Sequence, residues 1–367
     1  MPVPVPLSSF QHVQETTADL PWADLPTIDL SRFDTDKAEL AEQLITAIRT
    51  KGFFYVKGWK GISQERVDRQ FAIGQKVFEL PLEEKSKYTP NLDAGEYNGY
   101  RPAGRRVIEP ISGLTDRTEV FNIPKFNSFF EDHHKHHPAP VLRNFEEIKQ
   151  FARDLHTFII DPLLVLIALA LELPEDYLTN IHKYEAKSED HHRFMKYSKY
   201  TDEETATLLK TGEHWSRGHT DLGTLTLLFR QPVAALQIQD HSTGEWRWVK
   251  PQDGTLTVNA CDALSFLTAN YVKSTIHRVT VPPADQRHVD RLGLLYFARP
   301  HNDVVLNTIK ESPVLQRAGF IENQFEKVGS VPTMEEWTVR KQTWQQAKGG
   351  YKENAVILPG FQERVYK

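Results

Sequence analysis

The sequence predicts a β-rich fold, a sandwich or small barrel with helices around it. The stretch 225–281 contains short runs rich in β-branched and aromatic residues, and turn signals separate these runs. Strands at this spacing are typical of sandwiches and barrels, whereas β–α–β units would place helical patterns between them. The runs are 225–229, 235–238, 245–249, 255–258 and 275–281, and the turns include 230–232, 242–244 and 251–254.

The remaining elements flank this core. Apolar residues at helical spacing predict helices, and short apolar runs between breakers predict strands. The stretch 97–106 is rich in Gly, Tyr and Arg and is expected to be a loop. The expected strands are 25–30, 52–56, 116–122 and one within 188–201, and the expected helices are 38–50, 64–80, 140–173 and one within 332–349.

Composition limits the class of protein. The chain has 367 residues, a net charge of −5 and no long basic run, which gives no support to nucleic-acid binding. Its one cysteine, Cys261, excludes an internal disulfide and indicates a reducing compartment. The N-terminus does not resemble a signal peptide, and no apolar run is long enough to span a membrane. We therefore expect a cytoplasmic protein with no membrane partner, and the sequence does not indicate its oligomeric state.

Three metal-ligand residues stand out. His219 and Asp221 lie two positions apart, so on an extended segment they share a face and can point at one ion. His277 would then reach the same ion from a neighbouring strand. Two histidines and one carboxylate on one side of an ion form the facial triad of non-haem iron(II) enzymes. Because a lone His-x-Asp often occurs by chance, the surrounding motifs carry the argument further.

Four stretches extend this pattern: Gly218-His219-Thr220-Asp221, the run 254–264, the run 273–279, and Arg291. In this order and spacing they resemble the iron(II)- and 2-oxoglutarate-dependent dioxygenases of the isopenicillin N synthase type. The family usually has a glycine before Asp262, where this chain has Cys261. The resemblance implies a mostly β fold with flanking helices and a double-stranded β-helix (jelly-roll, cupin-like) core.

The resemblance also implies the cofactors and the chemistry. Iron(II) would be held by His219, Asp221 and His277, and 2-oxoglutarate and dioxygen would take the open positions. Decarboxylation of 2-oxoglutarate would give succinate, carbon dioxide and an iron(IV)-oxo species that abstracts a hydrogen atom. Arg291 is the expected anchor for the distal carboxylate of 2-oxoglutarate. The family usually has a serine two positions later, where this chain has Gly293, which leaves conventional anchoring open.

Other pocket residues are expected from the same resemblance. On the strand within 188–201, Tyr197 is the first candidate for contact with 2-oxoglutarate, and Lys196 is the second. The substrate is expected to be a small organic molecule, as in fungal members that act in natural-product pathways, and to be hydroxylated, desaturated or rearranged. The expected substrate-binding residues are Tyr100, Arg105, Phe121, Asn122 and Phe297.

Arg105 and its neighbour Arg106 have two interpretations. They can meet an anionic group of the substrate, or they can be exposed arginines in a solvated turn. Arg287 is a weaker alternative to Arg291. The polar segment 202–212 is hypothesised, from its length alone, to lie over the pocket opening.

The other histidines are not expected to bind a functional metal. His133, His134, His136 and His137 form a cluster in a polar linker, where we expect them to titrate in solvent. The pair 191–192 and His214 lie near the motifs but belong to none of them. If His219 is not a ligand, His214 is the first substitute.

The expected organisation is one structural unit with five parts. They are an arm (1–26), an N-terminal α/β region (27–130), backing helices (140–184), the jelly-roll catalytic core (185–305) and a C-terminal helical extension (306–367). Two further functions stay open beside the 2-oxoglutarate-dependent oxygenase. One is an oxidase like isopenicillin N synthase, which uses iron and dioxygen without a 2-oxo acid, and the other is a non-catalytic ligand-binding barrel. A zinc hydrolase is remote, because no general base is evident beside the triad.

Overall fold

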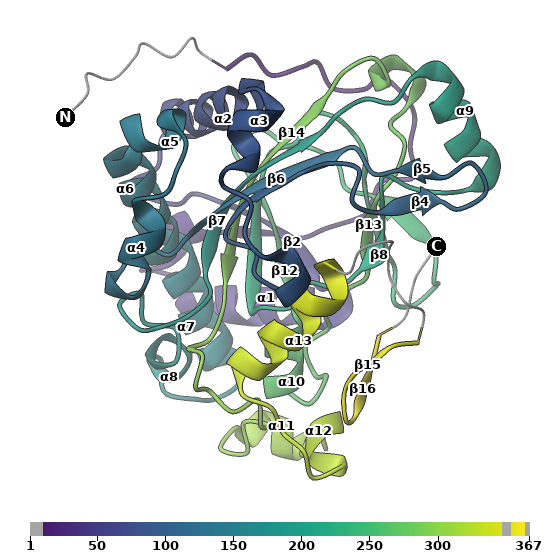
Figure 1. The fold of residues 1–367 in the computed structure, drawn as a ribbon. Helices are drawn as coiled ribbons and strands as arrows, with labels where there is room; N and C mark the ends of the chain where they lie inside the picture. Colours follow the sequence, from purple (N-terminus) through teal and green to yellow (C-terminus); the bar gives the residue numbers. More distant parts are fainter. Residues whose placement is uncertain (1–9, 347–353, 364–367) are drawn as a thin grey trace.

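The computed structural model describes residues 10–346 and 354–363, which form a core of two β-sheets with helices around it (Figure 1). The larger sheet has the strand order β1-β2-β12-β9-β14-β7-β6-β3, and the smaller has the order β11-β10-β13-β8. The bounds in the larger sheet are β1 Thr27–Asp29, β2 Phe53–Lys57, β12 Leu256–Ala260, β9 Leu225–Phe229, β14 Arg291–Ala298, β7 His191–Tyr197, β6 Thr118–Pro124 and β3 Gly99–Arg101. Those in the smaller sheet are β11 Trp246–Trp248, β10 Leu236–Gln239, β13 His277–Val279 and β8 Ser216–His219.

Consecutive strands of the core cross from one sheet to the other, as in a jelly roll. β8 belongs to the smaller sheet, β9 to the larger, β10 and β11 to the smaller, and β12 to the larger again. The pairs are antiparallel, apart from the parallel pair β1–β2 at one edge. The predicted fold class, a jelly-roll core with flanking helices, is confirmed.

Alternation along the strands separates a helix-facing side from a cavity-facing side. On β9, Leu225, Leu227 and Phe229 belong to the main hydrophobic core, whereas Thr226 and Leu228 line a cavity between the sheets. The same period of two recurs on β12, β14 and β7, as expected for strands. The sequence pattern of each strand therefore decides which side chains can reach the site.

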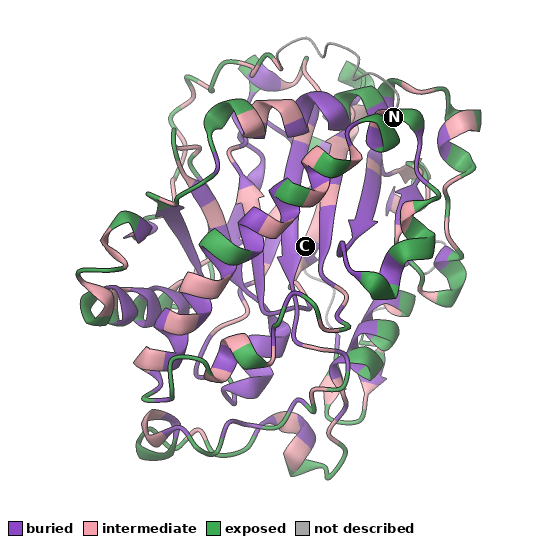
Figure 2. Ribbon diagram, turned by 90° about the vertical axis from the view of Figure 1, so that its left-hand side faces the viewer, coloured by how far each residue is buried: buried purple, intermediate pink, exposed green. Residues whose placement is uncertain are grey.

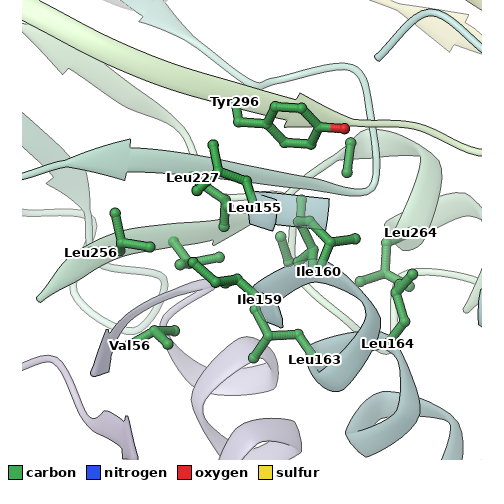
Figure 3. Packing of buried hydrophobic residues seen from close by; sticks show 14 of the residues in the cluster. Val56, Leu155, Ile159, Ile160, Leu163, Leu164, Leu227, Leu256, Leu264 and Tyr296 are labelled. Carbon is green, nitrogen blue, oxygen red and sulfur yellow. The ribbon is translucent and has the colours of Figure 1, made fainter. Parts of the chain in front are cut away.

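Helices cover the outer face of the larger sheet. Figure 2 shows them crossing in front of the buried strands. Leu155, Ile159 and Leu163 belong to the same buried apolar cluster as Leu227 and Leu256 of the sheet (Figure 3). The longer helices are α1 Lys37–Thr50, α2 Gln64–Glu79, α6 Phe145–Leu155, α7 Asp161–Ala170, α9 Asp202–Thr211 and α13 Met334–Gln346. The shorter ones are α3 Leu82–Ser86, α4 Glu131–His134, α5 Ala139–Arg143, α8 Tyr177–Asn180, α10 Asp262–Leu267, α11 Pro313–Arg317 and α12 Gln324–Lys327.

The backing helix is interrupted, which differs from the single helix expected over 140–173. α5, α6 and α7 are separate, and a π-helical turn, His156–Ile160, joins the last two. Pro162 lies in the first turn of α7. It has no N–H and its ring crowds the preceding turn, so the regular hydrogen-bond ladder cannot pass through it.

The elements before residue 130 agree with the sequence, apart from the expected loop 97–106. That segment contains β3, whose residues pair with β6 in the register Tyr100↔Phe121. A short hairpin, β4 Val107–Glu109 and β5 Leu114–Thr115, follows it. A second hairpin, β15 Val356–Leu358 and β16 Phe361–Gln362, lies beyond α13.

The histidine cluster does not lie wholly in solvent, which corrects the expectation. His134 stacks on Phe126 with ring centroids 4.7 Å apart, and His137 is buried. Burial lowers the pKa of His134 to about 4 and that of His137 to about 3. Phe126 and its neighbours supply this apolar surface through the fold, so the polar linker itself gave no sign of it.

The N-terminal arm lies partly outside the described residues, since these begin at residue 10. Its described part contacts the core: the backbone N–H of Thr17 donates to Asp285, and Trp22 forms a β-bridge with Trp248. Among the described helices, none combines the length and the apolar character that crossing a bilayer requires.

Candidate metal centre and the cavities beside it

The pairing of β8 with β13 brings the three predicted metal ligands together. His219 is the last residue of β8 and lies directly opposite His277, the first residue of β13. Asp221 lies two positions after His219. The Nε2 atoms of His219 and His277 lie 3.9 Å and 3.8 Å from Oδ1 of Asp221. One ligand atom from each residue lies within 4.8 Å of the others. This spacing leaves room for one ion between them.

Hydrogen bonds around the triad set the direction of each ligand. His219 Nδ1 lies 2.9 Å from the carbonyl oxygen of Arg217, and His277 Nδ1 lies 3.1 Å from that of Thr275. A carbonyl can only accept, so each Nδ1 carries the proton and each Nε2 presents its lone pair to the ion. Asn259 of β12 donates to Oδ2 of Asp221 at 3.0 Å.

The electrostatics of the triad favour its deprotonated, metal-binding form. Burial lowers the pKa of His219 to about 3, with a further contribution from His277. Burial raises the pKa of Asp221, but the two histidines and Asn259 outweigh it and bring the pKa down to about 2. Two neutral imidazoles and one carboxylate on one side are the donor set that suits iron(II) with open positions. Within 10–346 and 354–363, no other group of His, Cys, Asp or Glu side chains is close enough to hold an ion.

Two cavities meet at this triad. The inner cavity, about 610 Å³ with its solvent-open part included, lies between the sheets, and every residue lining it except Asp221 belongs to a strand. The outer cavity, about 1100 Å³ and partly open to solvent, reaches the surface. Both are lined by Arg193, Met195, Tyr197, His219, Asp221 and Phe297.

Arg291 lines the inner cavity, as expected for an anchor of 2-oxoglutarate. It is 4% exposed, its Nε has no hydrogen-bond partner, and no described Asp or Glu forms an ion pair with it. Burial lowers the pKa of this guanidinium, and the Tyr197 ring lies 5.4 Å away on the paired strand. A buried cation without an anion is costly, so a carboxylate ligand fits this end of the cavity.

Gly293 also faces the inner cavity, at the position where the family usually has serine. A Cβ added there would lie 3.3 Å from Cδ1 of Leu295 and 3.4 Å from Cβ of Met195. The first contact is tight and the second is close to ordinary van der Waals distance, so a serine would require the end of the Leu295 side chain to move by a few tenths of an ångström.

The outer cavity receives two of the five expected substrate-binding residues. Asn122 and Phe297 line it, together with Arg106. Phe121 does not, because neighbouring residues on a strand face opposite sides and its ring lies in the core. Tyr100 is paired with Phe121, also lies in the core, and donates to Glu119. Neither Phe121 nor Tyr100 therefore lines the inner or the outer cavity.

Arg105 likewise does not line either cavity. Its guanidinium forms an ion pair with Asp93 and donates to the backbone carbonyl of Gln346 in α13 at 3.1 Å. The neighbouring Arg106 donates to the carbonyl of Gln345 at 2.8 Å. Both arginines therefore hold the C-terminal helix, and only Arg106 also reaches the cavity.

Sequence reasoning missed several residues of the outer cavity. Arg193 lies near the start of β7, Arg299 directly follows the paired strand β14 at the same end, and three glutamines come from α13. Arg193 lies two residues after the start of β7 and shares its face with Tyr197, so alternation from Tyr197 could have identified it. The glutamines (Gln342, Gln345 and Gln346) gave no signal, because only long-range packing places α13 there.

The weaker alternatives occupy other places. Lys196 forms an ion pair with Asp290 at 2.9 Å, and Arg287 donates to the carbonyl of Pro282. His214 lies 3.0 Å from the hydroxyl of Thr280. The segment 202–212 forms α9, and none of its residues lines either cavity. Leu208 instead packs with buried aromatic residues beside the smaller sheet.

Comparisons with known proteins agree with this geometry. Residues 25–144 match the family model described as non-haem dioxygenase in morphine synthesis, N-terminal, and residues 177–300 match that of the 2OG-Fe(II) oxygenase superfamily. The 2-oxoglutarate-dependent dioxygenase frbH of Dothideomycetidae sp. is 30% identical over 78% of this chain and 85% of its own. The corresponding enzyme gloE of Glarea lozoyensis is 28% identical over 94% of both chains.

A solved structure shows the same fold. A full-length Neurospora crassa protein, solved in complex with alpha-KG and thymine, superposes with a TM-score of 0.73 at 21% identity, over 88% of this chain and 99% of its own. The family matches, the two dioxygenase relatives and the triad between the sheets agree with one another. The chain belongs to the 2OG-Fe(II) oxygenase superfamily and is an iron(II)- and 2-oxoglutarate-dependent dioxygenase.

Proposed function

We propose that this enzyme oxidises a small organic molecule held in the outer cavity, with iron(II) bound by His219, Asp221 and His277. 2-Oxoglutarate occupies the inner cavity, with its distal carboxylate on Arg291 and Tyr197 beside it. The proposed reaction is a hydroxylation, desaturation or rearrangement. Natural-product biosynthesis, the expectation from the resemblance to fungal members, is the proposed setting. The protein is proposed to be cytoplasmic and to bind neither nucleic acid nor membrane.

The observation that carries this proposal is the buried guanidinium of Arg291, without an ion-pair partner, in the same cavity as the triad. The distal carboxylate of 2-oxoglutarate calls for a cation, and Arg291 supplies one at that position. A non-catalytic barrel would have no use for the triad. Both features together favour the 2-oxoglutarate-dependent reaction over these two alternatives.

The chain's own residues have separable roles in this reaction. Bound iron(II) supplies the activation of dioxygen, coupled to the oxidative decarboxylation of 2-oxoglutarate to succinate. Asp221 lowers the positive charge of the site and stays ionised, since its pKa is about 2. Asn259 holds Oδ2 of that carboxylate, so Oδ1 faces the histidines. The strands around the inner cavity exclude water with apolar side chains such as Leu228 and Leu295.

An anaerobic titration tests the proposal directly. Iron(II) is added to the metal-free protein, then 2-oxoglutarate, while the weak visible charge-transfer band of the chelate is followed. We expect one iron and one 2-oxoglutarate per chain, and no band in the His277→Ala variant. Iron binding without the band would favour the oxidase, and absence of iron binding at micromolar concentration would favour the non-catalytic barrel. Release of succinate in air is the independent check.

A further inference from the structure

Arg193 presents a cation to the outer cavity without a carboxylate partner. It projects from β7, lines both cavities, and lies over the ring of Phe297, with 4.4 Å between the guanidinium carbon and the ring centroid. Its Nε donates to Oδ1 of Asn122 at 2.7 Å, and its Nη2 lies 3.2 Å from Nε2 of His191. No described Asp or Glu oxygen lies within ion-pair distance of it, so its charge is not neutralised by a direct contact.

Both of its hydrogen-bond partners are neutral and fixed in orientation. Asn122 donates its amide N–H to the carbonyl of Tyr97 at 2.6 Å, which leaves Oδ1 for Arg193. His191 Nδ1 lies 3.1 Å from the carbonyl of Glu189, so its proton is there and Nε2 accepts from the guanidinium. Burial holds the pKa of His191 well below its ordinary value, which keeps this ring uncharged. The two contacts aim the guanidinium but leave its positive charge in place.

A second guanidinium adds to the charge. Arg299 lines the outer cavity, is 2% exposed, and donates from Nη1 to the hydroxyl of Tyr97 at 2.6 Å. Its buried Nε has no hydrogen-bond partner. The Tyr97 hydroxyl donates in turn to Glu189, so the Arg299 guanidinium reaches this carboxylate only through a phenol. The backbone N–H of Arg299, and not its guanidinium, donates to Asp190. Burial, and after it the repulsion from Arg299, lowers the pKa of Arg193 to about 10 against the opposing attraction of Asp221.

The other charges of the cavity do not balance this pair. Arg101 is already paired with Asp116 at 2.7 Å, and Arg217 lies 3.4 Å from Glu213. Asp221 is committed to the metal site. Arg299 is buried and Arg193 is half-buried. Leaving such charges without a counter-ion is unfavourable, so a site that keeps them fits an anionic ligand.

We propose that the substrate of this enzyme is a carboxylic acid, whose carboxylate docks on Arg193, next to Arg299, in the outer cavity. A guanidinium fork matches a carboxylate with two parallel hydrogen bonds, and the ring of Phe297 lies beneath that fork to support an apolar part of the acid. Because Arg193 lines both cavities, the acid group lies close to the triad, and the carbon to be oxidised is a few bonds from the carboxylate. This inference rests on the proposed function and names the substrate class for the same site.

The test compares acids with neutral molecules of the same shape. The full chain is loaded anaerobically with iron(II) and 2-oxoglutarate, and calorimetry measures binding of arylacetic, arylpropionic and cyclohexylalkanoic acids and of their primary amides. We expect at least one acid to bind tenfold or more tightly than its amide, and Arg193→Met to bring the affinity for that acid down to that of the amide. Arg193→Lys should keep part of the preference. Arg247→Met is the matched control, because Arg247 is a surface residue paired with Glu245.

Three outcomes overturn the inference. The first is that no acid in the panel binds, or that acids and amides bind equally to the native complex. The second is that Arg193→Met weakens acid and amide alike while its thermal unfolding stays native. The third is that Arg193→Met abolishes the 2-oxoglutarate charge-transfer band, which would assign Arg193 to the cosubstrate. If instead the native chain forms no iron and 2-oxoglutarate complex, the proposed function itself fails, and the two failures are thus distinct.

Discussion

The inner and outer cavities share His219 and Asp221 of the metal triad, but they are built from different kinds of structure. Strands supply every residue lining the inner cavity except Asp221, whereas the outer cavity adds loops, the β4–β5 hairpin and the helix α13. Each cavity holds a guanidinium without an ion-pair partner among the described residues, Arg291 in the inner and Arg193 in the outer. The comparison teaches that strand register alone can build nearly all of one cavity wall, whereas the other wall also depends on segments outside the sheets.

We expect mutations behind the outer wall to lower the stability of the fold more than mutations in the inner wall. Lys341 of α13 tests this and should give the largest loss of unfolding free energy. Its fully buried ammonium on α13 forms ion pairs with Glu363 and, at 3.6 Å, with Asp262. Lys341→Met leaves two buried carboxylates without a cation, which costs about 3–5 kcal/mol of unfolding free energy. Chemical denaturation measures this loss. The double variant Lys341→Met with Glu363→Gln should regain part of this loss. An unchanged stability of the single variant would show that the two ion pairs do not stabilise the fold.

In the inner cavity, we expect mutations to change the affinity for 2-oxoglutarate and not the stability of the fold. Arg291→Leu removes the cation that we assign to the distal carboxylate, which should cost about 2–5 kcal/mol of 2-oxoglutarate binding, roughly 30-fold or more in affinity. Iron(II) binding should persist, because Arg291 is not a ligand. Anaerobic titration of the charge-transfer band measures both, with Arg287→Leu as the matched control. Native 2-oxoglutarate affinity in Arg291→Leu would remove the cosubstrate from this cavity.

The inner cavity is built by strands and the outer cavity also by loops and a helix, and this difference decides how much of each could be predicted from the sequence. His219, Asp221 and His277 form a compact cluster because of strand pairing and the two-residue period, both of which leave a pattern in the sequence. Arg291 and Tyr197 lie on paired strands for the same reason. Phe121 and Asn122 are adjacent on one strand and were both expected in the pocket. Only one of them could face it, because neighbouring strand residues point to opposite faces of the sheet. Which of the two faces the cavity could not be decided without knowing the strand register.

The outer wall could not be predicted, because long-range contacts position it. α13 was expected as a helix packing on the barrel, and it is one, but nothing in its sequence indicates that it lines a cavity. The carbonyls of Gln345 and Gln346 accept from Arg106 and Arg105, more than two hundred residues earlier in the chain. Such a contact depends on the assembled fold and not on a local motif.

A third prediction measures how rigidly the strands hold the metal ligands. Asn259→Ala removes the hydrogen bond to Oδ2 of Asp221, so the carboxylate can rotate away from the histidines. Partners of metal ligands are typically worth 10–100-fold in metal affinity, and we expect a loss in this range for iron(II). The comparison is with Thr257→Ala on the same strand and the same cavity face, without 2-oxoglutarate present. Equal iron affinity in the two variants would show that the strands alone orient Asp221.

The smallest effects on stability and on 2-oxoglutarate affinity are expected at Gly293. This position tests whether packing fixes the wall of the inner cavity. Gly293→Ser adds a Cβ that meets Leu295 and Met195 at 3.3 and 3.4 Å, so overpacking should cost about 1 kcal/mol of stability. Because these side chains fill the space, the new hydroxyl should change 2-oxoglutarate affinity by less than about threefold, a hydrogen bond being worth roughly 1 kcal/mol at best. Adding Leu295→Val should relieve the strain and restore stability. A tenfold gain in 2-oxoglutarate affinity from Gly293→Ser alone would instead mean that the inner wall has room for the serine. The native chain would then simply lack the hydrogen bond that a serine hydroxyl donates.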